Sequence, residues 1–210
     1  MDSDMKFLKK MIRMSEVEGF LGEEFKRAGY SHSTIRRTPM GMRILVFASK
    51  PGLIIGRGGS KIKEMTTKLE KQFGFENPQL DVQQVESPDL DANIVAGEIA
   101  RALEMNISHK RIGNVMVKRI MESGAVGVEI LMSGKMGSAK ARRDRFTEGY
   151  LKHCGDIAQE MVDSAQATAN MKAGTIGIKV KIMKERSQLR LEAMQGINLE
   201  KPEEKKEEAK

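Results

Sequence analysis

The stretch IIGRGGSKI, residues 54–62, constrains the fold of this chain more than any other segment. It places three glycines and two cations between aliphatic residues. Glycine lets the backbone come close to a phosphate because it has no Cβ, and the free amides at the start of a following helix favour an anion. The stretch therefore predicts contact with the phosphate of a nucleotide cofactor or of an RNA backbone. A glycine-rich turn without a ligand is the third interpretation.

The two common nucleotide-binding motifs do not fit this stretch. A Walker A loop needs a lysine directly after its last glycine, but here Ser60 stands between Gly59 and Lys61. A dinucleotide fingerprint needs two residues between its second and third glycines, whereas Gly58 and Gly59 are adjacent. We therefore expect neither an NTP site nor an NAD site, and no cofactor.

The sequence around the glycines predicts the order helix, strand, strand, short helix, glycine loop, helix, strand. A capping box formed by Ser15 and Glu18, followed by Gly29, predicts the limits of the first helix. Apolar residues at helical or alternating spacing predict the other elements. The expected helices are 15–29, 53–55 and 60–73, and the expected strands are 32–38, 42–49 and 79–85. Gly56 and Gly59 then fall between two helices, in the pattern I-I-G-x-x-G-x-x-I.

This order and spacing resemble a type II KH domain, in which a GxxG loop between two helices clamps the backbone of single-stranded nucleic acid. We expect this domain at residues 17–86, after a helical extension at residues 1–16. Arg57 and Lys61 would add positive charge to the loop, and the flanking isoleucines would hold the two helices together. The residues expected to bind RNA here are Gly56, Arg57, Gly58, Gly59, Lys61 and Lys63.

The pattern of apolar residues predicts a second α+β domain at residues 87–185. Ser87-Pro88 is typical of a helix start, and the polar stretch AKARRDRF is expected to follow a loop formed around Gly134 and Gly137. The expected helices span about 87–106 and 110–122, and alternating apolar residues predict strands around 126–132 and 176–182. We therefore predict two helices packed on an antiparallel sheet. Residues 186–210 form a Lys/Glu-rich tail for which disorder is expected.

The charge of the chain favours a polyanionic partner. The net charge is +7, and two basic blocks, 30–74 and 109–145, flank an acidic block at 75–108. Clustered Lys and Arg displace counterions from phosphates, so RNA is the leading interpretation, and a solvated surface of uneven charge is the alternative. The single cysteine, Cys154, excludes an internal disulfide, and no apolar run reaches the roughly 20 residues that cross a bilayer. We expect a cytoplasmic protein without a catalytic or metal site.

The two predicted domains together resemble the ribosomal protein S3 family of the small subunit. The stretches GAVGVEILMSGKMG (124–137) and TIGIKVKIM (175–183) look like the strand-and-glycine-loop signature and the final strand of that family. The similarity covers about residues 5–185. The run RRDR at 142–145 departs from the bacterial pattern, which suggests an archaeal or eukaryotic-type member.

The resemblance implies a structural, non-catalytic component of the small ribosomal subunit. It implies a position in the subunit head, beside the channel by which mRNA enters, with small-subunit rRNA, mRNA and neighbouring ribosomal proteins as partners. It implies no membrane partner and no small-molecule substrate. The basic second helix of the α+β domain would face RNA at or near that channel. The residues expected to bind RNA on basic faces are Arg36, Arg37, Lys110, Arg111, Lys118, Arg119, Lys135, Lys140, Arg142, Arg143 and Arg145.

Two other functions compete with this interpretation. A free KH regulator or decay factor that acts on single-stranded mRNA would share the glycine loop, but it would not need this particular second domain. A nuclease or nucleotide-dependent enzyme would need a metal–carboxylate cluster or an intact P-loop. The sequence favours the ribosomal interpretation over both.

Overall fold

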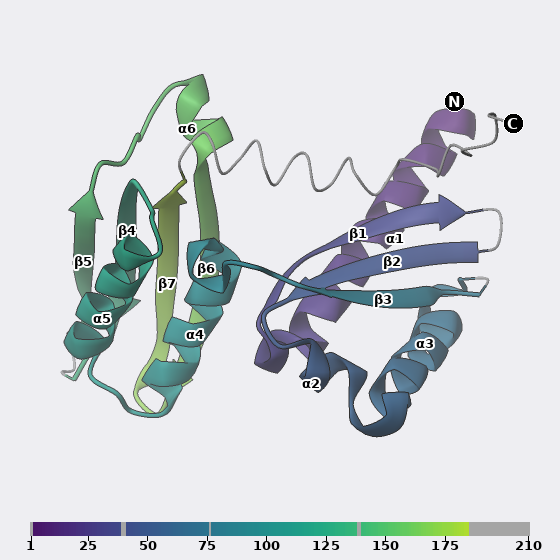
Figure 1. The fold of residues 1–210 in the computed structure, drawn as a ribbon, viewed down its shortest axis with the longest axis horizontal. Coiled ribbons are helices and arrows are strands. Elements are labelled where there is room, and N and C mark those ends of the chain that lie inside the picture. Colours follow the sequence, from purple (N-terminus) through teal and green to yellow (C-terminus); the bar gives the residue numbers. More distant parts are fainter. Residues whose placement is uncertain (1, 39–40, 76, 138–139, 185–210) are drawn as a thin grey trace, which may run out of the picture.

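The computed structural model describes residues 2–38, 41–75, 77–137 and 140–184. The chain forms two units that lie side by side, each of them a β-sheet with helices packed on one face (Figure 1). Within the described residues, no helix combines the length and the apolar character needed to span a membrane.

The first unit follows the predicted order of elements. Its elements are α1 (Asp2–Glu24), a 3-10 turn (Lys26–Ala28), β1 (Tyr30–Thr38), β2 (Gly41–Ala48), α2 (Pro51–Ile55), a second 3-10 turn (Arg57–Gly59), α3 (Ser60–Phe73) and β3 (Gln79–Gln84). The sheet has the order β1-β2-β3, in which β1 is antiparallel and β3 is parallel to the central β2. The glycine loop therefore connects α2 to α3, and the predicted type II KH topology is confirmed.

The core of the first unit lies between its helices and one face of the sheet. Val17 and Leu21 of α1 and Phe25 directly after it, each four residues from the next, are buried in the same cluster as Ile44 and Val46 of β2. Successive residues of a strand point to opposite faces, so the residues that alternate with these on β2 face away from the helices. Each buried side chain of this size stabilises the fold by about 1.5 to 3 kcal/mol. One face of the sheet is thus covered, and the other stays open.

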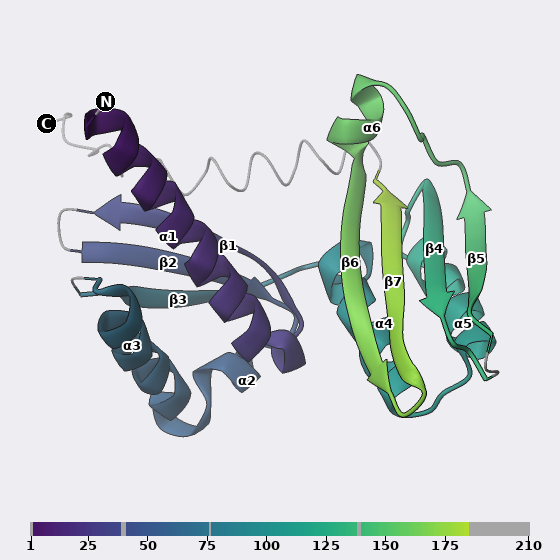
Figure 2. The ribbon, with the colours of Figure 1, turned by 180° about the vertical axis from the view of Figure 1, so that it is seen from behind.

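The second unit is the predicted pair of helices on an antiparallel sheet. Its elements are a 3-10 turn (Pro88–Leu90), α4 (Ala92–Glu104), α5 (His109–Glu122), β4 (Gly127–Gly134), β5 (Arg142–Gly149), α6 (Asp156–Met161), β6 (Val162–Met171) and β7 (Gly174–Met183). The four strands have the order β5-β4-β7-β6, and every neighbouring pair is antiparallel. Helices α4 and α5 cover one face (Figure 1), and the view from behind shows the face that they leave open (Figure 2).

Apolar residues of β4 and β7 form the core beneath α4 and α5. Ile130 and Met132 of β4 and Ile178 and Val180 of β7 are almost fully buried there. Gly113 allows α5 to lie close to β5, because a Cβ at this position would be 2.7 Å from the ring of Phe146. The position of α5 is therefore fixed by close packing and not by charge alone.

Two predicted features of the secondary structure are wrong in detail. Helix α1 does not begin at Ser15 but runs through it from Asp2, because the residues before Ser15 contain no glycine or proline to end a helix. Helix α4 is not capped by Ser87: the carboxylate of Asp91 accepts hydrogen bonds from the amides of Asn93 (2.9 Å) and Ile94 (3.2 Å). The polar stretch that follows the Gly134/Gly137 loop continues into the edge strand β5.

The two units are held together where β1 meets the start of α4. The buried hydroxyl of Ser31 donates a hydrogen bond to Asp91, and the amide side chain of Asn93 donates to the carbonyl of Ser31 (3.0 Å). Farther along α4, Arg101 donates to the carbonyl of Arg27 (3.2 Å). These contacts fix the start of α4 against the first unit. The expected domain limits at 16/17 and 86/87 stay predictions, and the tail at 186–210 lies outside the described residues.

Candidate nucleic-acid interface

The glycine loop is a tight turn between α2 and α3. Gly56, Gly58 and Gly59 all have positive φ angles, of 72°, 59° and 73°, which residues with a Cβ rarely adopt. No side chain caps the start of α3, so its first amides have no side-chain partner. The loop therefore combines a backbone that needs glycine with a helix start that favours an anion.

The glycines of the loop serve two different purposes. A Cβ at Gly56 would lie 3.0 Å from Cγ of Lys61, so this glycine allows the loop to fold back onto α3. A Cβ at Gly58 or Gly59 would meet no atom within 4 Å. At these two positions the backbone is open to the surroundings, and glycine is needed for its φ angle and not to avoid a neighbour.

The aliphatic residues beside the loop divide between the core and the surface. Ile54 is fully buried and Ile62 is half-buried against the same core, so these two hold α2 and α3 together as expected. Ile55 does not, because it is 39% exposed, and Leu53 is 48% exposed. On a helix as short as α2, adjacent residues point in different directions, so only one of two neighbouring isoleucines can reach the core. An exposed aliphatic surface thus flanks the loop.

The charged residues of the loop face the solvent, with one tied to the backbone. Arg57 and Lys63 are exposed, and the ammonium group of Lys61 donates a hydrogen bond to the carbonyl of Leu53 (3.3 Å). This bond connects α3 to α2 across the loop. Lys61 therefore stabilises the shape of the loop as well as adding positive charge to it.

Arg36 and Arg37 lie at the other end of the first sheet. They pair with Arg43 and Met42, next to the turn between β1 and β2, whereas α2 follows the opposite end of β2. At about 3.3 Å per residue, the length of β2 separates them from the start of α2 by roughly 20 Å. The structure does not bring these two arginines to the glycine loop.

The second unit gathers most of its predicted RNA-binding residues at one end. His109, at the start of α5, contacts Asp144 of β5 at 3.0 Å, and this contact places the start of α5 beside the loop between β4 and β5. Exposed lysines and arginines at this end of the unit come from the start of α5, from the β4–β5 loop and from the start of β5. We call Lys110, Arg111, Lys135, Lys140 and Arg142 the basic end. Lys118 is exposed farther along α5.

Arg119 has a different environment from the other cations of α5. Its guanidinium forms ion pairs with Asp89 (2.5 Å) and Glu98 (3.2 Å), so it connects α5 to the residues before α4 and to α4 itself. Burial lowers the pKa of Arg119, but the hydrogen bond and charge of Asp89, together with Glu98, outweigh this effect and raise the pKa. Because two carboxylates compensate its charge, Arg119 is a structural cation and not part of the RNA surface.

The arginines of β5 point to both faces of the second sheet. Arg142 has the same orientation as Asp144, toward α5, whereas Arg143 and Arg145 have the orientation of Ser133 and Leu131 on the open face. Arg145 also forms an ion pair of 2.6 Å with the buried carboxylate of Glu129. Because β5 is a strand, these three arginines are distributed between two surfaces.

Sequence reasoning did not include Lys179 and Lys181 of β7 among the RNA-binding residues. They lie on the open face of the second sheet, because they alternate with the buried Ile178 and Val180. That alternation was visible in the sequence and could have identified them. Their proximity to Arg143 could not, because it depends on the pairing of β7 with β4.

The described residues give no support for catalysis or a metal site. They contain no group of three or more His, Cys, Asp or Glu side chains that could hold a metal ion. Cys154 is exposed, and the neighbouring His153 lies 3.8 Å from the carboxylate of Glu129, which is already paired with Arg145.

Comparisons with known families agree with this geometry. Residues 16–90 match the KH domain family, and residues 99–182 match the family described as "Ribosomal protein S3, C-terminal domain". The chain is 46% identical to the small ribosomal subunit protein uS3 of Methanocaldococcus jannaschii over 178 residues, which cover 85% of this chain and 86% of the relative.

Two further archaeal relatives carry the same name. Identity to uS3 of Natronomonas pharaonis is 45%, covering 90% of this chain and 62% of the relative, and identity to uS3 of Methanococcus aeolicus is 42%, covering 84% and 85%. These relatives agree with the archaeal type suggested by the RRDR run. The chain belongs to the uS3 family of small ribosomal subunit proteins.

Proposed function

We propose that this protein binds rRNA in the head of the small ribosomal subunit and lines the channel by which mRNA enters. The uS3 family is a family of ribosomal structural proteins and not of enzymes, and its KH domain is an RNA-binding module. The observation that carries the proposal is the glycine loop, with its positive φ angles and the uncapped start of α3 beside it.

The loop offers three complementary contacts to a single strand. The amides at the start of α3 can donate hydrogen bonds to a phosphate, and Arg57 adds a long-range attraction. The exposed Leu53 and Ile55 offer an apolar surface to a base or a ribose. The described first unit contains few exposed aromatic side chains for base stacking, so contact through backbone and aliphatic groups fits it better than a stacking platform.

The basic end would hold the same polyanion by charge alone. Its five exposed cations lie on one end of the second unit, next to α5, and each contact with a phosphate would release counterions. We assign the basic end and Lys118 to the rRNA and mRNA contacts near the channel.

Sedimentation tests this proposal against a free RNA-binding regulator. The tagged full-length chain is expressed in an archaeal host, and the lysate is fractionated on a sucrose gradient at moderate salt. We expect the protein to comigrate with the small subunit and to stay with it in 70S particles. Recovery in the slowly sedimenting fractions, with or without bound mRNA, would contradict the ribosomal function and favour the regulator.

A further inference from the structure

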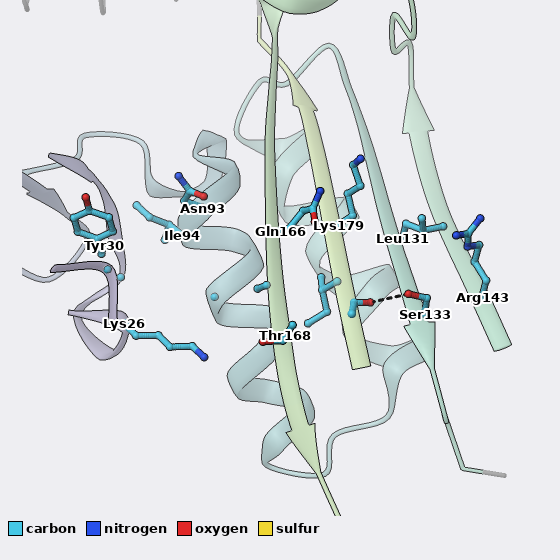
Figure 3. A pocket seen from close by; sticks show the side chains of 16 residues that line it. Lys26, Tyr30, Asn93, Ile94, Leu131, Ser133, Arg143, Gln166, Thr168 and Lys179 are labelled. Carbon is cyan, nitrogen blue, oxygen red and sulfur yellow. Dashed lines mark hydrogen bonds between the residues drawn. The ribbon is translucent and has the colours of Figure 1, made fainter. Parts of the chain in front are cut away.

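A cleft of about 580 Å³ lies between the two units, on the open face of the second sheet (Figure 3). One side is formed by the end of α1, the turn that follows it with Lys26, and Tyr30 at the start of β1. The other is formed by the start of α4 and by strands of the second sheet. Its volume is about twenty times the ~30 Å³ that a water molecule occupies, so a segment of a polymer fits it better than an isolated ion. Neither the glycine loop nor the basic end contributes to it.

The side chains that line the cleft carry positive charge only. Lys26, Arg143 and Lys179 line it, and no Asp or Glu among the described residues does. None of these three cations forms an ion pair with another described residue. The carboxylate of Glu129 lies on the same face of the sheet, but it is paired with Arg145. The cleft therefore has an uncompensated charge that favours an anionic ligand.

The polar groups of the cleft favour RNA over a protein segment. Ser133, Gln166 and Thr168 add hydroxyl and amide groups to the three cations, as Figure 3 shows. Ile94 and Ile178 also line the cleft but are almost fully buried, and no exposed large hydrophobic side chain of the described residues lines it. Protein interfaces have apolar centres, whereas interfaces with nucleic acids are polar and positively charged.

The cations are placed for a chain of phosphates. Arg143 and Lys179 lie on β5 and β7, with β4 between them, so about 10 Å separates their backbones across the sheet. Lys26 extends toward the sheet from the opposite side of the cleft (Figure 3). The hydrogen bonds of Ser31 with Asp91 and Asn93 join the two sides at the start of α4.

We propose that this cleft binds the sugar–phosphate backbone of RNA, with cations from both units on successive phosphates and the hydroxyl and amide groups on riboses. The site rests on the proposed RNA-binding function and adds to it a second, composite surface. It exists only when the two units have the orientation set by the contacts at the start of α4.

Charge-neutral substitutions test the cleft with naked small-subunit rRNA as the probe. The cleft variant is Lys26→Gln, Arg143→Gln, Lys179→Gln in the full chain. The matched control is Lys71→Gln, Lys172→Gln, Arg13→Gln, which removes the same number of exposed lysines and arginines, none of them in the glycine loop, in the basic end or among the residues that line the cleft. We expect the cleft variant to bind about tenfold more weakly, and the slope of log K against log salt to become shallower by about 2 to 3, because each lost phosphate contact contributes about 0.7 to 0.9. The control should stay within about twofold of the wild type.

Two results would overturn the cleft site. One is equal affinity and equal slope in the cleft variant and the control. The other is normal rRNA affinity in the cleft variant together with failure to enter the small subunit, which would assign the cleft to a protein neighbour. The variant Gly56→Asp, Gly59→Asp distinguishes the two proposals. If this variant loses rRNA affinity and the cleft variant does not, the glycine loop binds RNA and the cleft does not. If only the cleft variant loses affinity, the cleft binds RNA and the loop does not.

Discussion

The glycine loop and the basic end of the second unit are both suited to RNA, but they are built from different chemical groups. At the loop, the RNA-binding features come mainly from the backbone. Three glycines with positive φ angles expose the start of α3, and the buried Ile54 anchors the loop to the core. At the basic end, the backbone is ordinary helix and strand, and exposed side-chain charge is the main feature. A backbone site tolerates few substitutions, whereas a site made of separate charges loses affinity in small steps.

The largest expected effect concerns the support of the loop and is a change in stability. Ile54→Ala removes a fully buried side chain between α2, α3 and the sheet, and we expect it to lower the free energy of unfolding by about 2 to 5 kcal/mol. Ile55→Ala is the matched control. Because Ile55 is 39% exposed, this substitution should lower the free energy of unfolding by less than about 1 kcal/mol. Urea denaturation of both variants measures the difference. Equal losses would show that the loop is not anchored by Ile54.

The next effect concerns the backbone of the loop. In Gly56→Asp, Gly59→Asp, two carboxylates are introduced at loop positions with positive φ, and we expect about a hundredfold loss of affinity for small-subunit rRNA at moderate salt. Gly74→Asp, Gly155→Asp is the control: both glycines have positive φ angles and open surroundings, but they lie outside the loop. The control reproduces the positive φ angles and the added charge at positions outside the loop. If both double variants bind RNA equally well, the loop is not part of the RNA surface.

A smaller effect is expected at the basic end. Lys110→Gln, Arg111→Gln, Lys135→Gln should weaken rRNA binding by about tenfold and make the salt slope shallower by about 2 to 3, without a change in stability. The variant with substitutions at Arg13, Lys71 and Lys172 again serves as the control. An unchanged slope would mean that these exposed cations do not contact phosphates.

The smallest effect is expected at Arg119, which distinguishes structural cations from RNA-binding ones. Arg119→Gln removes ion pairs to Asp89 and Glu98, and because the side chain is 46% exposed we expect a cost of about 0.5 to 1 kcal/mol in unfolding free energy. The affinity for rRNA should stay within about twofold of the wild type. A loss of affinity as large as that at Lys110 and Arg111 would return Arg119 to the RNA surface.

The sequence predicted the loop well because its determinants are contiguous. The spacing of Gly56 and Gly59 and the apolar periods on both sides are local, and the order of elements around them is enough to indicate a type II KH topology. The same reasoning identified the two helices and the antiparallel sheet of the second unit.

The distribution of the cations could not be predicted in the same way. Whether Arg142, Arg143 and Arg145 share a surface depends on β5 being a strand, and their faces follow from its register with β4. The role of Arg119 depends on Asp89, thirty residues away, which only the packing of α5 beside α4 brings into contact. A candidate site formed by contiguous backbone can therefore be identified from local sequence patterns. A candidate site formed by side chains from separate elements can be identified only from the tertiary structure.

Ultraviolet cross-linking in intact small subunits tests the central claim most directly. Subunits that contain this protein are irradiated, digested with nuclease and protease, and searched by mass spectrometry for peptides that carry a nucleotide. The account predicts nucleotide adducts on the peptide that contains residues 56–61 and on peptides from the start of α5. Adducts on α5 alone, with the 56–61 peptide recovered unmodified, would contradict the claim that the glycine loop holds RNA.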